Sequence, residues 1–143
     1  YRDRCHVIPY GVPLDGYSSA PAPEVAAIKA KYGSDLIVSV GRLIYYKGFE
    51  YLIRAMVKAP GRLLIIGRGP LRSKLERLAT ELGVSDRVTL LVDVKNVVPY
   101  YHAAELFVLP SVSRSEAFGI VQIEAMATST PVINTRLDSG VAY

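Results

Sequence analysis

Short apolar runs recur along this chain and are separated by longer segments with helical spacing. Strands are predicted for the apolar runs at 36–40, 62–66, 88–92, 106–109 and 132–134, with a further short candidate at 6–9. Because apolar and polar residues do not alternate within the longer runs, we expect both faces of these strands to be buried. Such strands belong to a sheet that is covered on both sides.

The segments between these runs predict helices. Pro23 and Glu24 suit the first turn of a helix that ends at Gly33. Apolar residues at helical spacing predict further helices at 49–59, 71–82 and 97–105, and the last helix, 120–127, is apolar on all sides and is expected to be buried. The regular alternation of strand and helix predicts an α/β fold, a Rossmann-like open parallel sheet flanked by helices.

Composition narrows the possible functions. The 143 residues suffice for one domain, half of them are hydrophobic, and no apolar run approaches the roughly 20 residues of a transmembrane helix. The net charge of +4 suits a phosphate-bearing small ligand or an anionic membrane surface, whereas the lack of a basic block argues against nucleic acid. A single cysteine, Cys5, cannot form an internal disulfide and favours a reducing compartment such as the cytoplasm. No metal-ligand spacing is present, so we expect no metal.

In open parallel sheets, ligands bind beyond the carboxyl ends of the strands, near the point where the strand order reverses. The loops that follow the predicted strands are 10–13, 41–48, 67–70, 93–96 and 110–119. Together they supply glycines, two cations and two carboxylates.

The loop 41–48 carries Arg42 and Lys47 between two glycines. A guanidinium and an ammonium together would suit a diphosphate, although two solvated surface cations remain an alternative. Gly67 and Gly69 precede Pro70 at the start of a predicted helix, but Pro70 removes an amide, so a tight turn is favoured over an anion site. No acid follows at the spacing of a dinucleotide fingerprint, which argues against an NAD-dependent oxidoreductase.

The stretch 113–127 places two carboxylates, Glu116 and Glu124, eight residues apart around Gly119. Backbone amides at the start of the helix, those of Phe118, Gly119, Ile120 and Val121, can bind an anion. Glu124 could accept hydrogen bonds from the two hydroxyls of a ribose, and Glu116 could contact a second sugar. In the alternative interpretation, Glu116 caps a loop amide and Glu124 pairs with a buried arginine.

These motifs together resemble the C-terminal, nucleotide-sugar donor domain of GT-B-fold, family 4 retaining glycosyltransferases (glycosyl transferases group 1). The resemblance covers nearly the whole chain. It is carried by the G-R-x4-K-G loop at 41–48, by I-G-R-G-P at 66–70, by L-F-V-L-P-S at 106–111 and by S-E-A-F-G at 115–119 with the E-x7-E spacing.

The resemblance implies a role for each of these side chains. Arg42 and Lys47 would bind the donor diphosphate and assist its departure, and Glu116 would contact the transferred sugar. Glu124 would hold the ribose, and the loop at Val94 would line the base. The amides of Phe118, Gly119, Ile120 and Val121 would contact sugar and phosphate.

The resemblance also implies a nucleotide sugar as the donor substrate, with no cofactor, and a glycan or lipid acceptor held by an N-terminal domain absent from this chain. Residues 1–143 would then be one Rossmann-like donor domain, cut short at its C-terminal end, of a polysaccharide-type enzyme located in the cytoplasm or at the inner face of the membrane. Tyr10 stands where the family often has asparagine. A non-catalytic nucleotide or sugar-phosphate binding module is the alternative.

Overall fold

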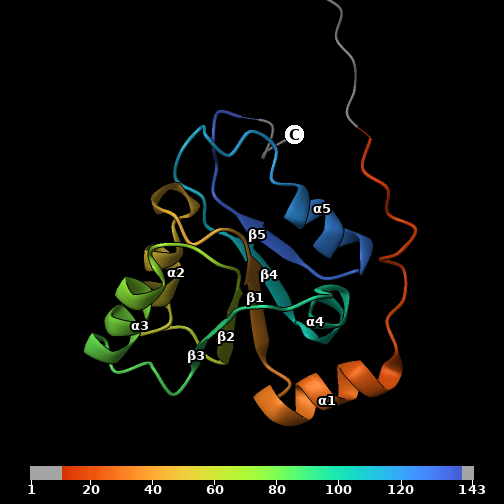
Figure 1. Ribbon diagram of the computed structural model, residues 1–143, viewed down its shortest axis with the longest axis horizontal. Helices are drawn as coiled ribbons and strands as arrows, with labels where there is room; N and C mark the ends of the chain where they lie inside the picture. Colours follow the sequence, from red (N-terminus) through yellow and green to blue (C-terminus); the bar gives the residue numbers. More distant parts are fainter. Residues whose placement is uncertain (1–10, 140–143) are drawn as a thin grey trace, which may run out of the picture.

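The sheet is the centre of the fold. The computed structural model describes residues 11–139, so the candidate strand at 6–9 lies outside the described residues. Five strands form one sheet in the order β3-β2-β1-β4-β5, and every strand pair is parallel (Figure 1). The strands are β1 (Leu36–Val40), β2 (Arg62–Ile66), β3 (Val88–Leu91), β4 (Leu106–Leu109) and β5 (Val132–Asn134). The predicted Rossmann-like open parallel sheet is therefore confirmed.

The helices cover both faces of this sheet. They are α1 (Ala22–Tyr32), α2 (Phe49–Ala55), α3 (Arg72–Glu81), α4 (Val98–Ala103) and α5 (Ile120–Ala127), with a short 3-10 helix, η2 (Tyr45–Lys47), before α2. Helices α2 and α3 lie on one face, and α1, α4 and α5 lie on the other (Figure 1). No helix in the described part of the chain is long and apolar enough to cross a membrane.

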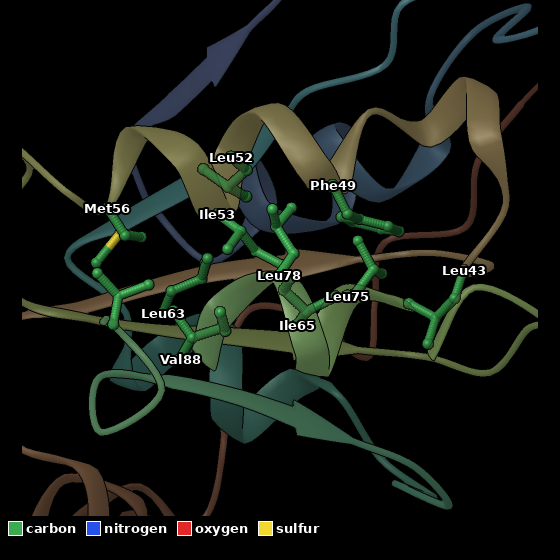
Figure 2. Packing of buried hydrophobic residues seen from close by; sticks show 12 residues of the cluster. Leu43, Phe49, Leu52, Ile53, Met56, Leu63, Ile65, Leu75, Leu78 and Val88 are labelled. Carbon is green, nitrogen blue, oxygen red and sulfur yellow. The ribbon is translucent and has the colours of Figure 1, made fainter. Parts of the chain in front are cut away.

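Strand β2 shows why the apolar runs do not alternate with polar residues. Leu63 and Ile65 point into the core beneath α2 and α3, whereas Leu64 and Ile66 point into the core beneath α4 and α5. Since successive side chains of a strand point to opposite faces, a sheet with two cores needs apolar residues at every position. Figure 2 shows the first of these cores, in which side chains of α2 and α3 meet those of β2 and β3.

Two helix predictions need correction. The helix expected at 49–59 ends at Ala55, and the chain continues as a turn in which the amides of Val57 and Lys58 donate to the carbonyls of Arg54 and Ala55. Beyond the helix, the Arg87 guanidinium donates to the carbonyls of Met56 (2.6 Å) and Ala59 (2.8 Å). The helix 120–127 is also not buried on all sides. It packs through Gln122 and Ala125, while Met126 is 62% exposed.

Candidate functional site

The strand order reverses between β1 and β4, so the loops that follow these two strands meet at the carboxyl edge. The amide of Val112 donates to the carbonyl of Tyr46 at 2.8 Å and joins the two loops. Gly48 has φ +67, and a Cβ atom at this position would lie 2.0 Å from the carbonyl oxygen of Pro110. Only glycine allows this approach, and the contact fixes the loop 41–48 against the loop 110–119.

A charged pair lies between these loops. Lys47 Nζ donates to Glu116 Oε2 at 2.5 Å, and the two side chains are only 11% and 10% exposed. The hydroxyl of Ser111, itself fully buried, donates to the same carboxylate oxygen at 2.7 Å. A buried ion pair needs further hydrogen bonds to offset the desolvation of both charges, and Ser111 supplies one. Lys47 is therefore not a solvated surface cation, and Glu116 has an ammonium and a hydroxyl as partners rather than a loop amide.

Arg42 differs from Lys47 in its exposure. Its side chain lies at the surface, and Nη2 donates to the Tyr46 hydroxyl at 3.3 Å. No carboxylate within the described residues lies within ion-pair distance of it. Lys47 Nζ lies 5.8 Å from the centre of the Tyr46 ring, so this tyrosine contacts both cations of the loop. The guanidinium therefore keeps donors that an anion at this edge could use.

Glu124 is half-buried on α5 and accepts a hydrogen bond of 2.9 Å from the Tyr101 hydroxyl. Burial raises the pKa of Tyr101, and the nearby Glu124 charge raises this pKa further. The pKa of Tyr17 is raised by burial and by its hydrogen bond to Glu124. Within residues 11–139, the partners of Glu124 are tyrosine hydroxyls and not the buried arginine of the alternative interpretation.

Sequence reasoning missed both tyrosines. Tyr101 lies 23 residues before Glu124 and Tyr17 lies in the segment before α1, so no local spacing links them to the carboxylate. The centres of the two rings lie 6.5 Å apart in the fold. Only the packing of α4 and of the segment before α1 against α5 brings the three side chains together.

The N-terminus of α5 lies on the same edge of the sheet. Gly119 precedes the helix with φ +67, and no side chain caps the first turn. The Gln122 side chain donates back to the Phe118 carbonyl at 3.0 Å and holds the entry loop. The first amides of a helix have no partner within it, so those of Ile120 and Val121 are available to an anion.

The loops after β2 and β3 form an open cavity of about 450 Å³, lined by Ile66, Gly67, Arg68, Asp93, Val94 and Lys95. Val94, which is predicted to contact the nucleobase of the donor, is part of this lining. Arg68 and Asp93 form an exposed ion pair at the cavity. A Cβ atom at Gly67 would lie 1.9 Å from the Gly41 carbonyl oxygen, so this glycine allows close packing of two loops.

The structure thus places the loops that carry Arg42, Lys47, Val94 and Glu116 directly after the carboxyl ends of strands of the sheet. Lys47, Glu116 and Ser111 are in direct contact at the point where the strand order reverses. Val94 lies apart from them, on the side of β3 and β2, and Glu124 lies on α5 beside α4. Two cations, a cavity, a hydroxyl-bound carboxylate and a helix N-terminus can together bind an extended anionic ligand that carries hydroxyls.

Comparisons with known proteins identify the family of the chain. The chain is 33% identical to D-rhamnosyltransferase WbpZ of Pseudomonas aeruginosa over its whole length, and 39% identical to D-inositol 3-phosphate glycosyltransferase of Mycolicibacterium smegmatis over 92% of its length. These matches cover 38% and 32% of the two relatives, so the chain spans about a third of their length.

Solved structures share the fold. WaaG, a glycosyltransferase involved in lipopolysaccharide biosynthesis, superposes on the whole chain with a TM-score of 0.84 at 28% identity, and the match covers 41% of WaaG. HepE of Anabaena, in a complex with UDP and glucose, superposes on 92% of the chain with a TM-score of 0.83 at 22% identity, over 38% of its own length. The family model described as Glycosyl transferases group 1 matches residues 23–143, and this chain therefore belongs to the group 1 glycosyltransferases.

Proposed function

We propose that this chain is the nucleotide-sugar donor domain of a retaining glycosyltransferase, with residues 1–143 forming one domain. The observation that carries the proposal is the buried Lys47–Glu116 pair at the point where the strand order reverses. Ligands of open parallel sheets bind at this edge, and a site for phosphate and sugar needs a cation and a hydroxyl acceptor there.

The diphosphate of the donor would bind between the loop 41–48 and α5. Lys47 has three N–H donors, and Glu116 accepts from the ammonium at a single carboxylate oxygen in the described structure. Arg42 adds an exposed guanidinium, which can bind two phosphate oxygens at once. The amides of Phe118, Gly119, Ile120 and Val121 would contribute neutral donors at the start of the helix.

The nucleoside would bind through Glu124 and the cavity at Val94. Glu124 already accepts from a tyrosine hydroxyl, which supports its use as an acceptor for the hydroxyls of ribose. The cavity of about 450 Å³ offers room for a base against Val94 and the neighbouring backbone. Glu116 would then accept from a hydroxyl of the transferred sugar.

In this proposal the anomeric configuration of the transferred sugar is retained. The bond from the anomeric carbon to the diphosphate oxygen would break while the acceptor oxygen bonds to the same face of that carbon. The proton of the acceptor hydroxyl would pass to the departing diphosphate, whose remaining negative charge the two cations would stabilise. Glu116 is paired with an ammonium and a hydroxyl, which suits a fixed hydrogen-bond acceptor better than a covalent nucleophile. Arg42, Lys47 and Glu116 would be the catalytic residues, with no metal or cofactor needed.

The acceptor would be a glycan or lipid held by a further domain of the whole protein, at work in polysaccharide synthesis in the cytoplasm or at the inner face of the membrane. The names of the relatives, a rhamnosyltransferase and an inositol phosphate glycosyltransferase, support sugar transfer as the reaction class. The isolated 143-residue chain would bind the donor without transferring its sugar. This is also what the alternative, a non-catalytic binding module, would do.

Titration calorimetry with UDP, GDP and ADP tests the proposal, and UDP is the first choice because HepE holds it. We expect one of the three to bind, and Arg42→Ala and Glu124→Ala each to weaken binding about tenfold, the loss of one strong hydrogen bond. Arg54→Ala, which removes an exposed arginine from α2, is the control. Binding that is indifferent to both site substitutions would refute the site. A sugar-transfer assay with the whole protein separates an enzyme from a binding module.

A further inference from the structure

Ser111 is a buried polar residue for which neither the sequence motifs nor the proposed donor contacts supply a role. It follows Pro110 at the end of β4, and its side chain has no exposed surface. Its hydroxyl donates to Glu116 Oε2 at 2.7 Å, and Lys47 Nζ donates to the same oxygen at 2.5 Å. Both donors therefore meet on one of the two oxygens of the carboxylate.

The second oxygen, Oε1, receives no hydrogen bond from any residue in the described part of the chain. A carboxylate oxygen can accept two hydrogen bonds, and an ammonium alone can bind either oxygen or both. With a hydroxyl fixed at Oε2, the position of the carboxylate is defined from two directions. Oε1 is left available to an outside donor, such as a sugar hydroxyl.

Thr135 fixes Ser111 from the neighbouring strand. It follows β5, its amide donates to the Leu109 carbonyl at 3.2 Å, and its hydroxyl donates to the Ser111 carbonyl. The pairing of Leu109 with Asn134 in the sheet brings the two residues side by side. A chain of hydrogen bonds thus runs from β5 through Ser111 to the Glu116 carboxylate.

We propose that Ser111, held by Thr135, is a positioning residue that keeps Glu116 bound through Oε2 and leaves Oε1 to a hydroxyl of the donor sugar. The inference rests on the proposed function, because it assumes that Glu116 faces the sugar. Without the Ser111 hydroxyl, Lys47 would be free to take Oε1 as well, and the sugar would lose its acceptor. Lys47 would keep its third N–H for the diphosphate, and the diphosphate contacts of Arg42 and the ribose contact of Glu124 would stay as they are.

The test compares a nucleoside diphosphate with its nucleotide sugar, UDP with UDP-glucose or GDP with GDP-mannose, by calorimetry on the 143-residue chain. In Ser111→Ala we expect affinity for the nucleotide sugar to fall about tenfold, the equivalent of one hydrogen bond to a charged group, while affinity for the diphosphate changes less than about twofold. Ser115→Ala removes an exposed hydroxyl from the same loop and should change neither affinity.

A second arm measures the contact without ligand, from urea unfolding of Ser111→Ala, Glu116→Ala and the double variant. The unfolding constant of the double variant should differ by about tenfold from the product of the single effects. If Ser111→Ala does not fold, Thr135→Val takes its place. This substitution keeps the shape of the side chain and removes the hydroxyl that donates to the Ser111 carbonyl.

The possible outcomes separate the two proposals. Equal losses for diphosphate and nucleotide sugar, or no loss for either, would overturn the positioning role of Ser111 and leave the proposed function standing. Additive effects on unfolding would also overturn it. A wild-type chain that binds no nucleoside diphosphate would overturn the proposed function, and the role of Ser111 with it.

Discussion

Lys47→Met tests whether the Lys47–Glu116 ion pair contributes to the free energy of unfolding as a buried pair should. The substitution keeps the length and apolar character of the side chain but leaves the Glu116 carboxylate with Ser111 as its remaining partner. Breaking a buried ion pair from one side costs about 3–5 kcal/mol, because the other charge stays buried. Since each side chain retains about a tenth of its exposure, we expect the lower end, about 3 kcal/mol.

The double variant Lys47→Met, Glu116→Gln makes the prediction sharper. It removes both charges and keeps an oxygen that can accept from Ser111, so no unpaired charge stays buried. Replacing a whole buried pair by neutral groups is often close to neutral, and we expect the double variant to lose about 1 kcal/mol or less. It should therefore be more stable than Lys47→Met alone.

Urea unfolding at 25 °C, followed by far-UV circular dichroism, measures these differences, and an unchanged m-value shows that the folded and unfolded states stay comparable. Arg72→Met is the matched control, because its partner Glu76 lies one helical turn away and both side chains are about half exposed. This surface pair should contribute less than about 0.5 kcal/mol. Two results would contradict the buried ion pair. One is a loss of unfolding free energy in Lys47→Met as small as that of the control. The other is a double variant whose loss equals the sum of the losses of the two single variants.

Two further predictions concern loop packing and pH. Gly48→Ala would place a Cβ 2.0 Å from the Pro110 carbonyl oxygen and should cost more than about 3 kcal/mol in thermal unfolding. Gly83→Ala, with the same φ of +67 and nothing within 4 Å, should lose only the backbone term of about 1 kcal/mol, and equal losses would contradict the contact. Because burial beside Glu124 raises the pKa of Tyr101 above 10.0, the unfolded state releases its proton first, so stability should fall above about pH 10. That fall, about 1.4 kcal/mol per pH unit for one tyrosine, should diminish in Tyr101→Phe, and an unchanged pH profile would contradict the assignment.

The strands of the sheet could be predicted from the sequence because each strand is marked by residues that are consecutive in the chain. Each strand is a short apolar run with both faces buried, and the predicted bounds of β1, β2, β4 and β5 agree with the structure. The end of α2 could not be predicted in this way. The residues after Ala55 form a turn, and the Met56 carbonyl in this turn accepts from Arg87, which lies some 30 residues further along the chain and is brought to it only by the fold.

The candidate site was predicted as a set of residues but not as a set of contacts. The motifs identified Lys47 and Glu116. Their ion pair, however, joins residues 69 positions apart and forms because β1 and β4 are neighbours in the sheet. Ser111 was part of a recognised motif without any assigned contact. The exposure of α5 was mispredicted for a related reason, because composition shows how apolar a helix is and not how much of it is covered.

Amide chemical shifts of the 15N-labelled chain, followed during titration with a nucleoside diphosphate, test the central claim most directly. We expect shifts in the loop 41–48, at the start of α5 and around Val94, all at the carboxyl edge of the sheet. The opposite edge offers a cavity of about 290 Å³ that Asp35, Gly61 and Asp86 help to line. Shifts confined to that cavity, or none at all, would contradict the proposed donor site.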